Sequence, residues 1–159
     1  MARSTGLPSS AVQREALAGL RALYDEVDAL FGGITCEAST DCCRFGVTGR
    51  EPYPTAVELA LLERAVAARG GLPKPPRLPV VSERRCPLLG ADGRCVAYAS
   101  RPFGCRTFFC ERATPPADGV SRRDVQRLAR DVAALSERFD PRDPQARPLS
   151  RAVAAWRSR

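Results

Sequence analysis

Cysteine is the residue that most constrains what this chain can fold into. The chain has seven cysteines in 159 residues and no histidine. They form two groups in the sequence: Cys36, Cys42 and Cys43, followed by Cys86, Cys95, Cys105 and Cys110. Thiols at this density, without any imidazole, build either a thiolate metal site or a disulfide framework. The choice between these two therefore decides what the chain can do.

A disulfide framework is the weaker interpretation. Because the number of cysteines is odd, at least one thiol would stay unpaired, and pairing the adjacent Cys42 and Cys43 would close a strained ring. Residues Met1 to Pro8 hold no apolar segment of the kind that directs secretion, and disulfides are rare in a reducing cytosol. Scattered buried thiols are another alternative, but they do not normally gather in such groups. We expect a cytoplasmic protein whose cysteines bind metal.

Length and charge limit the remaining classes. The length fits one domain, which we place at residues 1–139, with residues 140–159 as a linker and a short C-terminal helix. No apolar run approaches the roughly 20 residues that span a bilayer, so we expect no membrane contact. The net charge is +7, and all but Lys74 of the 25 basic residues are arginine. Since the arginines are spread along the chain, we do not expect a nucleic-acid surface. A protein partner stays open.

Three long helices are expected from the spacing of apolar residues. They run from about Ser10 to Phe31, from Thr55 to Gly70-Gly71, and from Ser121 to Phe139. Ser10, Thr55 and Ser121 can each cap a helix, and Glu58 completes a capping box with Thr55. The predicted fold is therefore small and mainly α-helical, with three main helices, irregular metal-binding cysteine-rich loops and one short β-hairpin.

The hairpin is predicted at the start of the second cysteine group. The residues from Cys86 to Cys95 would turn at Asp92-Gly93, which would bring Cys86 and Cys95 close together. Cys105 and Cys110 would follow on one short helix or turn. We expect the neighbouring aromatic residues to pack into the core: Tyr98, Phe103, Phe108 and Phe109.

Ligand chemistry favours iron over zinc. Thiolates are soft ligands that suit both zinc and iron–sulfur clusters. Structural zinc sites usually use paired CxxC knuckles, and this chain has no intact CxxC. Iron–sulfur clusters accept looser spacing, because their ligands arrive from several loops. On an extended backbone, Cys42 and Cys43 would point in different directions. An iron–sulfur cluster, most simply one [4Fe–4S] cluster, is the favoured cofactor, and zinc is the alternative.

The order of the motifs resembles a known family. Cys36-x-x-Ser39-x-x-Cys42-Cys43 resembles a CxxCxxCC signature. After it come Thr55-x-x-Glu58 at a helix start, Cys86-Pro-Leu, a Gly-Arg-Cys turn, and Arg101-Pro102-x-x-Cys105-Arg106. From about residue 35 to residue 110 the chain is similar to the YkgJ-like cysteine-cluster family, which is described as zinc- or iron-chelating. The resemblance implies that all seven cysteines are candidate metal ligands, and it leaves open whether the protein is an enzyme.

Ser39 is the position at which the chain departs from that family, which has a cysteine there. Eight thiolates could fill two four-ligand sites, whereas seven fill one site and leave three. A second site is therefore absent, incomplete, or completed by an outside ligand. Beside Cys105, Arg101 and Arg106 are candidate cofactor-binding residues, because they could donate hydrogen bonds to a cluster sulfur. The open alternative is that they pair with Glu111 or Glu83.

Two function classes follow. The first is an iron–sulfur protein with a redox, sensing or accessory role. The second is a zinc-stabilised module that binds a protein or a nucleic acid. The chain has no Ser–His or Cys–His pair, no candidate histidine base and no Gly-rich phosphate loop. Hydrolase chemistry by those routes is excluded.

Overall fold

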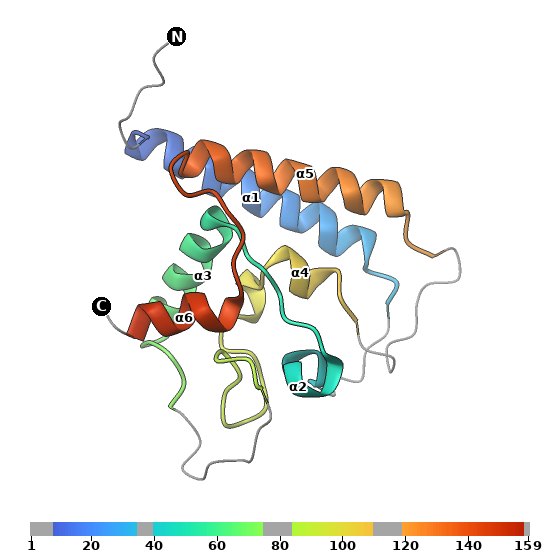
Figure 1. The fold of residues 1–159 in the computed structure, drawn as a ribbon. Helices are drawn as coiled ribbons and strands as arrows, with labels where there is room; N and C mark the ends of the chain where they lie inside the picture. Colours follow the sequence, from blue (N-terminus) through green and yellow to red (C-terminus); the bar gives the residue numbers. More distant parts are fainter. Residues whose placement is uncertain (1–7, 35–39, 75–83, 110–118, 158–159) are drawn as a thin grey trace.

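The protein is mainly helical, as predicted. The computed structural model describes residues 8–34, 40–74, 84–109 and 119–157. These residues form six α-helices and two short 3₁₀ segments, and Figure 1 labels the helices. In chain order these are α1 (Ser10–Leu30), η1 (Asp41–Cys43), α2 (Phe45–Thr48), α3 (Ala56–Ala68), η2 (Tyr98–Ser100), α4 (Phe103–Arg106), α5 (Arg122–Phe139) and α6 (Leu149–Arg157).

The two longest helices, α1 and α5, lie side by side and run in opposite directions (Figure 1). Their packing follows from apolar residues at helical spacing on each, such as Leu17 and Leu20 on α1 and Leu128 on α5, all almost fully buried. Burying each such leucine stabilises the fold by about 1.5–3 kcal/mol. Gly19 lets the helices approach closely, because a Cβ there would lie 3.2 Å from Leu135 Cδ2.

Helix α3 lies between two apolar clusters and joins them. Its residues Leu59 and Leu62 belong to a cluster that also contains Cys86, whereas Val57 and Leu61 belong to the cluster between α1 and α5. The predicted capping box at its start is confirmed, with Thr55 and Glu58 as the reciprocal pair. Because α3 is apolar on both sides, it behaves as the central core helix.

The C-terminal segment packs on the same body. Figure 1 shows it descending beside the chain that leads into α3. The Arg147 N–H donates to Pro54 O and the Leu149 N–H to Pro52 O, each at 3.1 Å. Leu149 on α6 is buried in the cluster that contains Cys86, and Trp156 packs against that cluster. The boundary placed at residue 139 stays a prediction.

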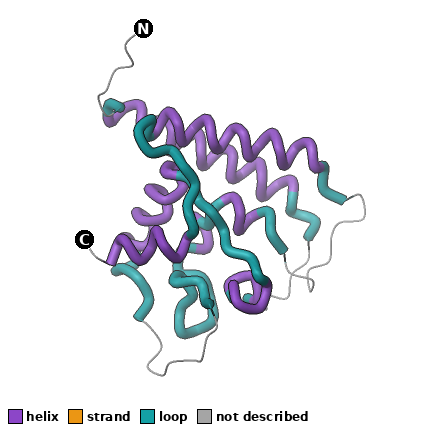
Figure 2. Tube along the Cα trace, viewed as in Figure 1, coloured by secondary structure: helices purple, strands orange, loops and turns teal. Residues whose placement is uncertain are grey.

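Three local predictions differ from the structure. The cap of α1 is Ser9, whose hydroxyl accepts from the Val12 N–H, one residue before the predicted Ser10. The predicted β-hairpin is wrong: Figure 2 shows no strand in the described residues, and the Cys86–Cys95 segment has one isolated bridge, Leu89 to Cys95. Pro87 has no N–H to offer a ladder, and so short a pair is marginal by itself. Tyr98 was expected in the core, yet it is 64% exposed.

Other predictions were closer to the structure. Ser121 caps α5 and accepts from the Asp124 N–H, as predicted. Cys105 lies on the short helix α4, whereas its expected neighbour Cys110 lies outside the described residues. In the part of the chain that the structure describes, no helix is both long and apolar enough to cross a bilayer.

Candidate metal centre

The two cysteine groups meet at Cys43 and Cys86. The Cys86 N–H donates to Cys43 O at 2.8 Å, and the next residues, Arg44 and Arg85, form an isolated antiparallel bridge. In this register Cys43 lies directly opposite Cys86. Cys86 is buried in the apolar cluster beneath α3, and Cys43 and Cys95 pack against that cluster. The backbone thus pairs Cys43 with Cys86, although the two residues are far apart in the sequence.

Cys42 and Cys43 have side chains that lie together. They belong to the 3₁₀ segment η1, and their Sγ atoms are 4.0 Å apart. The expectation that they would point in different directions is wrong, because the backbone here is a tight turn and not an extended strand. The hydrogen bond from Cys43 lowers the pKa of the exposed Cys42 thiol to about 7, and the same interaction raises the pKa of Cys43. One thiolate supported by its neighbour is therefore favoured over two.

The remaining described thiols resist ionisation. Burial, followed by the charges of Cys95 and Cys42, raises the pKa of Cys86 to about 12. Burial also raises the pKa of Cys95. Burial first, and then Cys86, Cys95 and Cys42, raises the pKa of Cys105. Neighbouring thiolates thus add to burial in disfavouring the ionised form of Cys86, Cys95 and Cys105.

These raised pKa values bear on whether the cysteines suit a metal. Thiols whose pKa is raised by burial and by neighbouring thiolates would ionise more easily around a cation, because a coordinating thiol is deprotonated by its metal. The donor set is soft and suits zinc or an iron–sulfur cluster. However, among the described residues no three side chains of the metal-binding types are gathered closely enough to hold an ion. Cys36, Cys110 and Ser39 lie outside the described residues.

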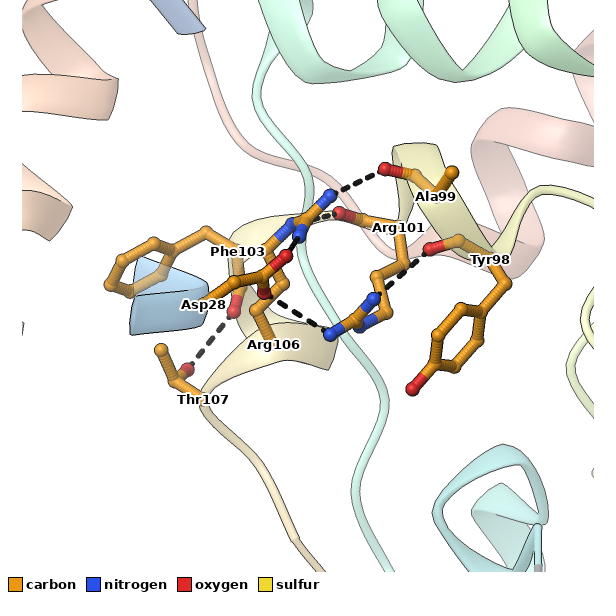
Figure 3. Close-up of polar contacts among 7 residues, drawn as sticks. All are labelled: Asp28, Tyr98, Ala99, Arg101, Phe103, Arg106 and Thr107. Atoms are coloured by element: carbon orange, nitrogen blue, oxygen red, sulfur yellow. Dashed lines mark hydrogen bonds and ion pairs between the residues drawn. The ribbon is translucent and has the colours of Figure 1, made fainter. Parts of the chain in front are cut away.

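Arg101 and Arg106 pair with Asp28 of α1, a partner that sequence reasoning missed. Figure 3 shows the Asp28 carboxylate between the two guanidinium groups. Arg101 Nη2 lies 3.1 Å from Asp28 Oδ1, and Arg106 Nη1 bonds Asp28 Oδ2. The Arg101 guanidinium also lies 4.2 Å above the Tyr98 ring. Asp28 is 44% exposed and belongs to no motif, so the sequence carried no signal for this contact.

Arg106 is buried and its three nitrogens are all engaged. Its Nε donates to Arg101 O at 2.9 Å and its Nη2 to Ala99 O at 2.6 Å, in addition to the Asp28 contact. Its guanidinium lies 4.0 Å above the Tyr24 ring. These bonds bind the turn before Cys105 to α4 and α1. The predicted cofactor-binding role of Arg101 and Arg106 stays a prediction, and so does the pairing with Glu83 or Glu111, which lie outside the described residues.

Glu58 has a second role beyond its helix cap. Its Oε2 accepts from the Thr55 N–H and hydroxyl, while its Oε1 accepts from the Tyr24 hydroxyl at 3.0 Å and the Phe103 N–H at 2.7 Å. The side chain is 2% exposed. Burial, and then the charge and hydrogen bond of Glu58, raises the pKa of Tyr24. Glu58 thus connects α3 to α1 and to the start of α4, the helix that carries Cys105.

Comparisons with known proteins give no match. No family model matches the chain, and neither the curated proteins nor the solved structures contain a significant relative.

Proposed function

We propose that this protein is a metal-binding cysteine-cluster protein in which thiolates from both cysteine groups hold one iron–sulfur centre with a redox, sensing or accessory role. The observation that carries this proposal is the pairing of Cys43 with Cys86, which joins the two groups at the backbone. The effect of Cys86, Cys95 and Cys42, whose charges add to burial in raising the pKa of Cys105 on α4, supports it. We also propose that the resemblance to the YkgJ-like family reflects a shared kind of site, and that the protein works in the reducing cytoplasm.

Iron–sulfur ligation suits a set of thiols that come from separate segments of the chain. They come from η1, from the segment after Arg85, from the turn at Cys95, and from α4. Clusters accept ligands from several separate loops. Buried surroundings and fixed backbone donors tune such a centre, and here Cys86 is buried while α4 is held by Arg106 and Glu58. When bound, the cluster would supply one-electron chemistry, and the chain would position and shield it.

Zinc is the second candidate, and the distance between the Cys42 and Cys43 sulfur atoms favours it. The Sγ atoms of Cys42 and Cys43 are 4.0 Å apart. In a tetrahedral site with Zn–S bonds of about 2.3 Å, two sulfurs lie about 3.8 Å apart. A zinc-stabilised module would then present its helices to a protein or nucleic-acid partner.

Anaerobic purification followed by metal analysis distinguishes the candidates. The iron–sulfur proposal predicts a brown protein with broad visible absorption and equal amounts of iron and acid-labile sulfide. A colourless protein with stoichiometric zinc would favour the second candidate. A folded protein that contains neither metal, and that takes up neither on reconstitution, would refute both. Cys36→Ser is the comparison variant, because we predict that Cys36 is the cysteine whose replacement metal binding tolerates best.

A further inference from the structure

Two arginines lie directly opposite each other beside the cysteine pair. Arg44 and Arg85 are the two members of the isolated antiparallel bridge. Side chains of directly opposite residues leave the same face of such a pair, and like charges in that position repel each other. The fold therefore starts two arginine side chains from one face of the pair, one from each cysteine group, although a neutral residue at either position would avoid the repulsion.

Each of these arginines also has a buried donor without a partner. The Nε atoms of Arg44 and Arg85 are the buried side-chain nitrogens that find no hydrogen-bond acceptor among the described residues. A buried donor left unsatisfied is costly, and such groups call for an explanation. Both members of this residue pair therefore call for an acceptor that the described residues do not supply.

The nearby carboxylates do not supply this acceptor. Asp41 Oδ1 lies 3.9 Å from Arg44 Nη1, which is a long ion pair to the tip of the side chain and not to Nε. Glu51 accepts from Arg84 Nη2 at 3.0 Å and from the Ser150 N–H at 2.7 Å. The Arg44 side chain is 41% exposed, so a small solute can reach its guanidinium from solvent.

We propose that Arg44 and Arg85 together bind a small oxyanion of the phosphate or sulfate class. Guanidinium groups bind such oxyanions with paired N–H donors, and a tetrahedral anion has enough oxygens to accept from two arginines at once. A bound anion would offset the repulsion between the two cations and satisfy both Nε donors. The proposal rests on the arginine pair alone and uses none of the cysteine side chains.

The test is the effect of phosphate on melting temperature, measured on the protein as purified at constant ionic strength. Phosphate stabilises many proteins by exclusion from their surface, so the informative quantity is the difference between variants. We expect phosphate far above its dissociation constant to raise the melting temperature of the wild type by roughly 5–10 °C more than that of Arg44→Gln or Arg85→Gln. Arg94→Gln is the matched control, since Arg94 is exposed and outside the pair.

The difference in melting temperature between Arg85→Gln and the wild type should also change sign when phosphate is added. Without oxyanion, Arg85→Gln removes the repulsion and should melt at or above the wild-type temperature; with phosphate it should melt below. Broadening of the ³¹P resonance of phosphate reports binding directly and should vanish in both Gln variants. Parallel titrations with sulfate and acetate separate tetrahedral anions from carboxylates. Phosphate responses equal to wild type in both Gln variants would overturn the proposal. If a Gln variant fails to fold, an unchanged response in Arg44→Lys and Arg85→Lys would overturn it.

Discussion

Replacing Glu58 with glutamine tests the connection between the helix cap and the segment that carries Cys105. The carboxylate accepts four hydrogen bonds, two on each oxygen, at 2.7 to 3.0 Å. Glutamine keeps one oxygen and turns the other position into an N–H donor. One of the two backbone N–H groups, of Thr55 or of Phe103, then faces a donor instead of an acceptor.

The expected cost follows from these contacts. A hydrogen bond to a charged group contributes roughly 1.5–3 kcal/mol, and a buried donor left unpaired costs a further 1–3 kcal/mol. Because the Thr55 and Tyr24 hydroxyls can rotate and recover part of this loss, we expect Glu58→Gln to lower the free energy of unfolding by about 2–4 kcal/mol. For a chain of this size that corresponds to a fall in melting temperature of roughly 5–15 °C.

Urea denaturation followed by circular dichroism at 222 nm measures the change. Glu137→Gln is the control, because Glu137 is exposed on α5, and exposed substitutions usually stay within about 0.5 kcal/mol. A double-mutant cycle with Tyr24→Phe isolates the second role of Glu58, and we expect a coupling above about 0.5 kcal/mol. A Glu58→Gln variant as stable as the control, or a cycle with no coupling, would refute the reasoning.

Three further predictions concern the supports of the cysteine loops. Arg106→Lys should cost on the order of 2–4 kcal/mol, since an ammonium cannot reproduce three directed bonds and the stacking on Tyr24; a loss below 1 kcal/mol in urea would contradict it. Burial raises the pKa of Glu51, but bonds from Ser150 and Arg84 outweigh it and lower that pKa overall. Glu51 therefore stabilises the fold at pH values above the ordinary glutamate pKa of about 4.3, and this contribution is lost as pH falls through the lowered pKa. The difference in free energy of unfolding between wild type and Glu51→Gln should shrink below about pH 4. A difference that is independent of pH would contradict this prediction. Metal removal by a chelator should lower the melting temperature while α1 and α5 keep their helicity; an unchanged melting temperature after complete metal loss would show that the metal does not contribute to folding.

The helices could be predicted because their signals are local. The starts of α3 and α5 are set by capping residues within three positions, Thr55 with Glu58 and Ser121 with Asp124. Apolar spacing then predicts which face is buried. The one-residue error at Ser10 arises because Ser9 and Ser10 are both able to cap, and the local sequence does not choose between them.

The candidate site was harder to predict, because its contacts are long-range. Asp28 and Arg106 are 78 residues apart, and Tyr24 and Glu58 are 34 apart. No local pattern selects such pairs from among many charged residues. The arrangement of Cys42 and Cys43 depends on Thr40, a non-glycine residue with φ of +60° before η1, which the sequence does not indicate.

Metal per chain in two cysteine variants tests the central claim, which is that one centre takes ligands from both cysteine groups. Cys43→Ser and Cys86→Ser remove one thiol from each side of the pair that the Cys86 N–H and Cys43 O connect. After anaerobic preparation, with folding checked by circular dichroism, we expect each single variant to lose the whole metal complement and the double variant to lose no more. Partial losses that add up in the double variant, or full metal content in either single variant, would contradict a shared centre.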